Sequence, residues 1–177
     1  VVLSALSGTT NALVSIGDSL ATNQKNEARD KILALRAHYE TFIAKLLSTT
    51  AEREEANAII DEHFEFLLIT LKISFNEALN RDILAQGELM STKLFTLYLQ
   101  EKGIKAVLLP ALEFMRTNED AEPDIPFASD QLNSLIAGHE GVILFITQGF
   151  ICKNHKGEID NLQRGGSDYT ASLIGAA

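Results

Sequence analysis

Apolar residues follow two patterns along the chain, and each pattern predicts a different kind of element. Short, nearly continuous apolar runs are typical of strands buried on both faces, and they cover residues 1–5, 104–109 and 142–146. Apolar residues spaced three and four apart predict amphipathic helices, here over residues 12–20, 26–47, 52–79, 81–101 and 129–137. Because strands and helices alternate, we predict an α/β fold whose mainly parallel sheet is covered by helices on both faces.

Turn-forming residues separate these segments. Gly103 follows the helix predicted over residues 81–101, as expected for a helix end. Residues 120–126 contain two prolines and three carboxylates, which predicts a loop. Residues 150–153 and 158–162 predict a hairpin. The sequence shows no internal repeat, and we predict one domain.

The two long helices predicted at 26–47 and 52–79 form an excursion of about residues 20–80 from the strand-rich part of the chain. Both carry many charged residues, including the run at 52–55. We therefore predict a solvated helical hairpin beside the core. The alternative is that its apolar face contacts another subunit.

Composition narrows the class of partner. The 177 residues carry a formal net charge of −9, and their basic residues are scattered, whereas nucleic-acid binding needs clustered ones. We expect no nucleic-acid partner. No apolar run approaches the roughly 20 residues needed to span a bilayer, so no membrane partner is expected either. Cys152 is the only cysteine, which excludes an internal disulfide and favours a cytoplasmic location.

The most informative stretch is the loop before the last predicted helix, Arg164-Gly165-Gly166-Ser167-Asp168. Arg164 can bind a carboxylate with two parallel hydrogen bonds, and the two glycines let the backbone approach a ligand closely. Ser167 or Asp168 can cap the helix, whose first N–H groups favour an anion. The stretch predicts an anion site, although an ordinary loop and helix cap would use the same residue types.

Two other loops directly follow predicted strands, at residues 4–10 and 147–150. In an open parallel sheet, ligands bind outside the carboxyl ends of the strands. We therefore expect both loops at one edge of the sheet. Spacing alone does not bring Glu88 or Arg164 to that edge.

Five segments, in this order, make the chain similar to the aspartate kinases of the amino acid kinase family. The similarity runs from end to end and is weakest at residues 20–80. The segments are residues 1–11 with Ser4-Ala5-Leu6-Ser7-Gly8-Thr9-Thr10-Asn11, residues 85–91 with Gln86-Gly87-Glu88, residues 114–124 with Arg116-Thr117-Asn118 and Glu122-Pro123-Asp124, residues 146–151 with Thr147-Gln148-Gly149-Phe150, and residues 162–171.

The resemblance implies a fold, an activity and a place in the parent protein. The fold would be a three-layer αβα sandwich of the amino acid kinase or carbamate kinase kind. The full-length enzyme, expected to be a homo-oligomer, would phosphorylate the β-carboxylate of L-aspartate with ATP and Mg, the first step toward lysine, threonine and methionine. Residues 1–177 would be the aspartate-binding part of the kinase domain. A lysine-containing loop, most of the nucleotide site and the ACT domains are expected outside it, so the isolated chain is expected to be inactive.

The resemblance also assigns the substrate-binding residues. Arg164 would bind the α-carboxylate of aspartate and Glu88 its ammonium group. Thr10 and Ser167 would donate to the carboxylate that is phosphorylated. Two further features would complete the pocket, with the Phe150 ring shaping it and the backbone of Gly165 and Gly166 lining it.

The remaining roles concern the phosphoryl group. Ser4 and Ser7 would add donors near its path, and Asp168 would act at the reaction centre as a catalytic residue that orients basic groups. The four histidines are far apart and show no metal-binding spacing. We therefore expect no protein-held metal, and magnesium would arrive with ATP.

Several alternatives stay open. Glu88 could be a solvated charge, Phe150 a core residue and Thr10 a helix cap. Arg116 and Thr117 could line the pocket or fix the loop at 120–126.

Gln163 stands where some aspartate kinases have glycine, which affects loop flexibility without removing a ligand group. The functional alternatives are another amino acid kinase, acting on glutamate or acetylglutamate, and a non-catalytic amino-acid-binding or oligomerisation module.

Overall fold

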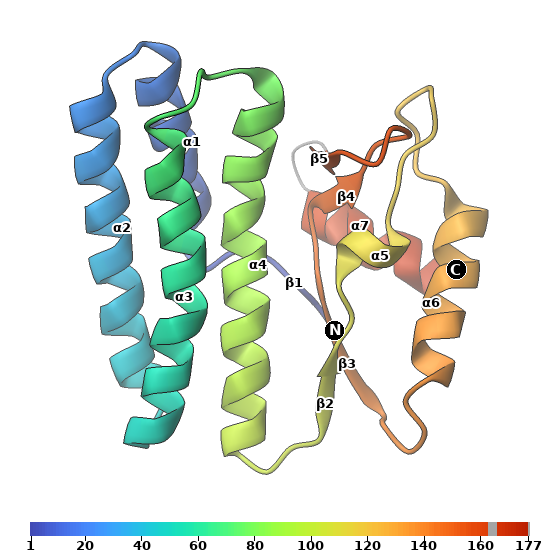
Figure 1. Ribbon diagram of the computed structural model, residues 1–177. Helices are drawn as coiled ribbons and strands as arrows, with labels where there is room; N and C mark the ends of the chain where they lie inside the picture. The colour runs from blue at the N-terminus through green and yellow to red at the C-terminus, as the bar shows by residue number, and fades with distance from the viewer. Residues whose placement is uncertain (163–165, 177) are drawn as a thin grey trace.

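A computed structural model describes residues 1–162 and 166–176 of the chain (Figure 1). Gln163, Arg164 and Gly165 lie outside the described residues, so the roles predicted for Arg164 and Gly165 stay predictions. In chain order the elements are β1 (Val2–Leu3), α1 (Thr9–Ala21), α2 (Lys25–Leu46), α3 (Thr50–Thr70), α4 (Glu77–Glu101), β2 (Ala106–Leu108), α5 (Ala111–Phe114), α6 (Ile125–Ala137), β3 (Leu144–Gln148), β4 (Ile151–Lys153), β5 (Ile159–Asn161) and α7 (Gly166–Ala176).

Three of the strands form a parallel sheet in the order β1-β3-β2. Leu3 at the end of β1 lies opposite Gln148 at the end of β3, and Leu108 of β2 lies opposite Ile146. The carboxyl ends of β1 and β3 therefore meet at one edge, as the sequence predicts. The other two strands, β4 and β5, form the predicted antiparallel hairpin.

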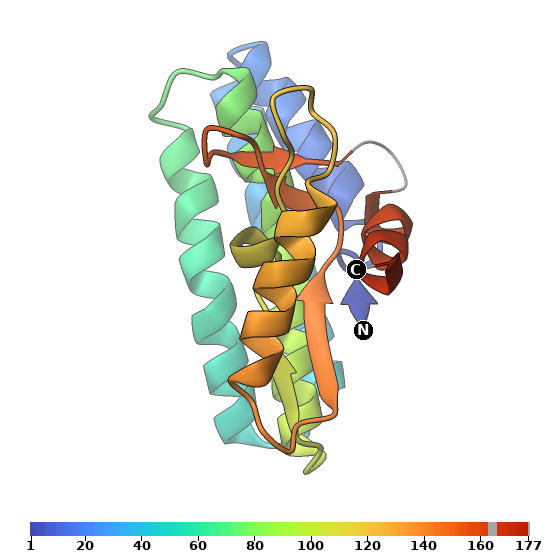
Figure 2. The ribbon, with the colours of Figure 1, turned by 90° about the vertical axis from the view of Figure 1, so that its right-hand side faces the viewer.

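Helices cover both faces of the parallel sheet (Figures 1 and 2). The long helix α4 contacts all three strands from one side. On the other side, Leu132 and Leu135 of α6 pack in the same apolar cluster as Val107 and Phe145 of the sheet, and α7 contacts β1. This arrangement confirms the predicted α/β sandwich.

Helices α1 to α4 pack side by side as a bundle with a core of its own (Figure 1). Tyr39 of α2 and Phe64 of α3 are completely buried in that core, where their rings meet edge to face with centroids 5.8 Å apart. The apolar residues of α2 and α3 that face this core are thus buried within the chain, and the subunit contact stays a prediction. Because α4 belongs to both the bundle and the sandwich, it joins the two cores.

The single helix predicted over residues 52–79 is wrong, because α3 ends at Thr70 and α4 begins at Glu77. The apolar spacing continues through the intervening segment, and that continuity hides the break from sequence analysis. Ile73, predicted to lie on the apolar face, is 44% exposed. The side chain of Asn76 accepts a hydrogen bond from the N–H of Leu79 at 2.8 Å, a typical N-cap that starts the next helix.

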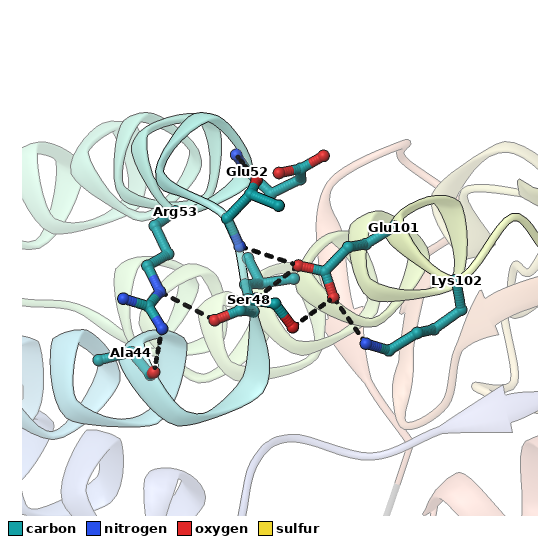
Figure 3. A network of polar contacts seen from close by, with 8 residues as sticks. Ala44, Ser48, Glu52, Arg53, Glu101 and Lys102 are labelled. Carbon is teal, nitrogen blue, oxygen red and sulfur yellow. Dashed lines mark hydrogen bonds and ion pairs between the residues drawn. The ribbon is translucent and has the colours of Figure 1, made fainter.

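A network of polar contacts fixes the turn between α2 and α3 (Figure 3). The Glu101 carboxylate at the end of α4 accepts hydrogen bonds from the N–H groups of Ser48 and Thr49 and from Lys102 at 2.9 Å. The Lys102 ammonium, followed by the Ser48 N–H, lowers the pKa of Glu101 to about 2. Arg53 donates to the carbonyls of Leu47 and Ala44, 2.8 and 3.0 Å away, at the end of α2.

The loop predicted over residues 120–126 is shorter in the structure, because α6 begins at Ile125. Pro126 falls within the first helical turn, where its missing N–H costs nothing. Asp124 caps this helix through the N–H of Phe127 and also accepts from Arg116 at 2.6 Å. Arg116 thus fixes the loop, and its guanidinium lies 3.6 Å from the centre of the Phe127 ring.

Candidate functional site

The first site element is the loop between β1 and α1. The loop turns at Gly8, whose φ of 83° favours glycine, and no side chain among the described residues caps α1. Thr10 therefore stands exposed in the uncapped first turn of a helix, where free N–H groups favour an anion. The capping role suggested as the alternative for Thr10 does not apply. Ser4 and Ser7 are also exposed on this loop.

Helix α4 holds this loop through three consecutive contacts. Gly87 lets the helix come close, since a Cβ at this position would lie 2.8 Å from the Cβ of Ala5. One residue further, the Oε1 atom of Glu88 accepts the Ala5 N–H at 3.2 Å. One turn later, the Ser91 hydroxyl donates to the Ser4 carbonyl at 2.7 Å. Residues Gln86–Ser91 of α4 thus hold the chain where it leaves β1.

Glu88 is a buried carboxyl group with spare hydrogen-bonding capacity. Its side chain is 3% exposed, and its Oε2 atom has no hydrogen-bond partner among the described residues. Burial raises the pKa of Glu88 to about 7, partly offset by the Ala5 N–H. An ammonium group that reached Oε2 would satisfy that oxygen and favour the ionised form. The solvated-charge alternative for Glu88 is excluded by its burial.

The start of α7 packs directly on the ends of β1 and β3. The Ser4 hydroxyl donates to the Ser167 hydroxyl at 2.7 Å, across 163 residues of sequence. Gly149, just after β3, makes this approach possible because a Cβ there would lie 2.6 Å from the Ser167 Cβ. The Gly149 N–H in turn donates to the Leu3 carbonyl at 2.8 Å. Residues from both ends of the chain therefore meet at one edge of the sheet.

Phe150 connects this edge to the segment before α7. It has a positive φ of 65°, and hydrogen bonds to its backbone N–H and its backbone carbonyl hold this conformation. Its N–H donates to the Thr170 hydroxyl at 3.1 Å, and its carbonyl accepts from the Leu162 N–H at 2.6 Å. A Cβ at Gly166 would lie 2.9 Å from the Phe150 ring, so Gly166 is needed for this contact.

Some of the predicted site residues contact one another directly, and others lie at the periphery of the site. Ser4 contacts Ser167, Phe150 contacts Gly166, and Glu88 reaches the same loop through Ala5. Asp168 is exposed in the first turn of α7, and its backbone carbonyl accepts a hydrogen bond from the Ser172 hydroxyl at 3.0 Å.

Sequence analysis missed the buried residues that support the site. Gln148 at the end of β3 is buried; its Oε1 accepts the Ala111 N–H at 2.7 Å, and its Nε2 donates to the Thr92 hydroxyl at 2.8 Å. That hydroxyl donates to the Glu88 carbonyl at 2.8 Å, which links β3 to the turn of α4 carrying Glu88. One sequence signal could have indicated this role: Gln148 is a long polar residue at the end of an apolar strand, and a polar side chain buried there needs hydrogen-bond partners.

Two further features of the described residues concern metal ions and membranes. Among residues 1–162 and 166–176, no three His, Cys, Asp or Glu side chains are arranged to hold a metal ion. Within the same residues, none of the helices combines the length and apolarity required to cross a bilayer.

Together, the fold and the candidate site define an α/β protein in which two helix N-termini and one buried carboxyl group lie at the carboxyl-terminal edge of a parallel sheet, an arrangement suited to a small ligand. The model of the amino acid kinase family matches residues 1–177. The chain belongs to the amino acid kinase family.

The similar proteins are aspartokinases. Lysine-sensitive aspartokinase 3 of Escherichia coli is 36% identical across all of this chain, and bifunctional aspartokinase/homoserine dehydrogenase 2 of the same organism is 33% identical across 99% of it. The chain spans only 39% and 22% of these two proteins. The crystal structure of E. coli aspartokinase III with lysine and aspartate matches 98% of this chain and 39% of its own, with a TM-score of 0.82 and 33% identity.

Proposed function

We propose that the chain is the acceptor-binding part of an aspartate kinase, which transfers the γ-phosphoryl group of MgATP to the β-carboxylate of L-aspartate. The products are 4-phospho-L-aspartate and ADP, and the reaction is the first step toward lysine, threonine and methionine. The observation that carries this proposal is the buried Glu88 carboxyl group, one oxygen of which has no partner among residues 1–162 and 166–176, in a chain similar to aspartokinases over its whole length. Two of the similar crystal structures contain aspartate.

Ionised Glu88 provides the group that selects an amino acid. Its Oε2 atom accepts from the substrate ammonium while Oε1 keeps the Ala5 N–H. Bringing an ammonium to a buried carboxylate pairs two charges that would each be costly alone. A ligand with an acylated nitrogen, such as acetylglutamate, cannot make this ion pair and is expected to bind poorly.

Hydroxyl groups and helix ends receive the carboxylate that is phosphorylated. The Ser4 hydroxyl donates to the Ser167 hydroxyl, and both can turn to donate to an incoming carboxylate. Thr10 and the N–H groups at the start of α1 add donors on the same loop, and Ser7 lies beside them. Phe150 shapes the site and the backbone of Gly165 and Gly166 is proposed to line it, while Arg164 is proposed to bind the α-carboxylate.

The chemical step is an in-line attack of one β-carboxylate oxygen on the γ-phosphorus of ATP. The bond from that phosphorus to the β–γ bridging oxygen breaks, and ADP leaves with the electron pair. Catalysis of this kind consists of positioning and of neutralising charge on the phosphoryl oxygens. Asp168 is proposed as the residue that orients basic groups there, and magnesium, brought by ATP, would supply much of the neutralisation.

Binding measurements test this proposal and separate it from its alternatives. Calorimetry with L-aspartate, L-glutamate and acetylglutamate should show selective binding of aspartate by the chain. Arg164→Ala and Glu88→Gln should each abolish that binding. Selective binding of glutamate or acetylglutamate would instead indicate another amino acid kinase. Absence of binding to all three would favour an oligomerisation module.

Turnover is a separate question, because the chain spans 39% of the E. coli aspartokinase 3. We propose that a polypeptide of these 177 residues, assayed alone with ATP and aspartate, forms negligible ADP. Steady ADP production that depends on aspartate would refute this part of the proposal.

A further inference from the structure

We propose that Tyr39, in the middle of the helical bundle, is a positioning residue for the acceptor site. Its hydroxyl holds Thr9 and, through Thr9, the loop at residues 4–10. The bundle formed by α1 to α4 would then set the geometry of the site, in addition to filling space beside the sheet. The effect on ligand binding rests on the proposed function, whereas the effect on the loop does not.

The contact that carries this inference is the hydrogen bond from the Thr9 hydroxyl to the Tyr39 hydroxyl at 3.1 Å. Both residues are completely buried, so no water competes for the bond. Among the described residues, this is the one side-chain hydrogen bond that joins α2 to the loop and first turn of α1. On its other side the Tyr39 ring packs against Phe64 of α3, which fixes where its hydroxyl lies.

Thr9 occupies the point where three site elements meet. Its N–H donates to the Leu6 carbonyl at 2.9 Å and closes the turn of the loop. Its methyl group lines the close approach of Gly87, where a Cβ would lie 3.3 Å from it. The next residue is Thr10, and the residue after Gly87 is Glu88. A shift of Thr9 would therefore move both of these predicted ligand groups.

Apolar packing behind the loop is incomplete, which increases the importance of the hydrogen bond. A cavity of about 250 Å³ lies there, bounded by Leu3–Ser7 on one side and by Tyr39, Phe42, Leu46, Ser91, Leu94 and Phe95 on the other. A close-packed interior would fix the loop by contact alone. Because this cavity is partly open to solvent, apolar contacts do not enclose that side of the loop, and discrete polar contacts contribute to fixing its position.

A loop that is held before the ligand arrives binds more tightly, because less conformational entropy is lost on binding. Removing the Tyr39 hydroxyl leaves the buried Thr9 hydroxyl without a partner, and the loop gains freedom to sample other positions. We expect the equilibrium constant for holding the loop in its observed position to fall about two- to tenfold, which is the range for the net contribution of one hydrogen bond.

The test compares Tyr39→Phe with Ile43→Val in the same chain. Ile43 lies one turn further along α2 and is equally buried, but its side chain has no polar atom; its variant loosens the same core without removing a hydrogen bond. Hydrogen exchange of the Ala5 and Thr9 amides, measured without ligand, should accelerate about two- to tenfold in Tyr39→Phe and stay unchanged in Ile43→Val. Equal exchange rates in the two variants would overturn the inference.

Three further variants separate positioning from general stability. Thr9→Val should reproduce the effect of Tyr39→Phe, the double variant should add little to either, and Thr9→Ser should restore slow exchange. Additive effects would show that the two residues act independently and would contradict the proposal.

Calorimetry with aspartate then measures whether the hydrogen bond of Tyr39 affects ligand binding. Tyr39→Phe should weaken aspartate binding by a similar factor, and Ile43→Val should not. If the unaltered chain failed to bind aspartate, the proposed function would fall, while the exchange rates would still decide the role of Tyr39.

Discussion

Replacing Glu88 by glutamine should make the protein more stable and at the same time remove its ligand binding. Burial raises the pKa of Glu88 from 4.5 to about 7, so folding favours the protonated form. The carboxyl group therefore costs the fold nothing below pH 4.5. Its cost grows as pH rises and is complete once pH has passed through 7. A change of this size corresponds to roughly 3 kcal/mol in the free energy of unfolding at pH 8 and above.

Glutamine keeps an oxygen that can accept the Ala5 N–H and carries no charge at any pH. Its NH₂ group takes the place of an oxygen that has no partner, and burying that unpaired amide costs about 1 to 2 kcal/mol. We therefore expect a net gain of about 1 to 2 kcal/mol at pH 8, falling to a loss of similar size at pH 4.5, where the wild-type carboxyl group is neutral.

Urea unfolding followed by circular dichroism, at several pH values from 4.5 to 9, measures this difference. The matched control is Glu55→Gln, because Glu55 is exposed on α3 and its replacement should leave the pH profile unchanged. The reasoning would be refuted by parallel stability profiles for wild type and Glu88→Gln. It would also fail if the variant were less stable at pH 9 than at pH 5 relative to wild type.

The same carboxyl group gives aspartate binding a pH dependence. Only ionised Glu88 can pair with an ammonium, so binding should strengthen up to about tenfold per pH unit below 7 and level off above pH 8. A flat profile between pH 5.5 and 8 would mean that Glu88 does not receive the ammonium.

Three other changes probe the supports of the site. Gly149→Ala places a Cβ 2.6 Å from that of Ser167, so we expect about 1 to 3 kcal/mol of destabilisation by urea unfolding together with loss of aspartate binding by calorimetry; an unchanged affinity would show that this close approach is not needed. Gln148→Leu leaves the Ala111 N–H without its acceptor, which should cost about 1 to 3 kcal/mol in the same unfolding assay. The lowered pKa of Glu101 contributes stability above pH 4.5 that is lost as pH falls toward 2, so Glu101→Gln should flatten the acid limb of thermal unfolding; an acid limb identical to wild type would contradict this.

Much of the fold follows from the periodicity of the sequence, because periodicity reports directly which faces are buried. The apolar runs at 104–109 and 142–146 correctly predict two neighbouring strands, displaced by up to two residues at their ends. Periodicity fails at the junction of α3 and α4, since apolar residues continue through the break and the signal for a new helix rests on Asn76 alone. A cap depends on local hydrogen bonding, which hydrophobic spacing does not report.

Part of the site could also be predicted, because the predicted strands imply the topology of the sheet. Loops after parallel strands must lie at one edge, which places Ser4 near Gly149 from topology alone. The position of Glu88 comes from the packing of α4, and only the family resemblance suggested it. Tyr39 and Gln148 were missed because an aromatic residue on a helix and a glutamine after a strand have no spacing that distinguishes them from ordinary core residues.

Among the described residues, Glu88 is the clearest case of a side chain that its own surroundings do not favour. An isolated carboxyl group is rarely buried without a partner for each oxygen, and the helix around it would gain stability from a neutral residue. The surrounding contacts nevertheless preserve it: Gly87 permits the close approach of α4, Ser91 holds the strand end, and the Ala5 N–H satisfies one oxygen only. Such a local cost is expected at binding sites, where a ligand completes the missing interaction. The Oε2 atom, which has no partner among the described residues, is therefore the observation that supports the proposed pairing of Glu88 with the ammonium group of an amino acid.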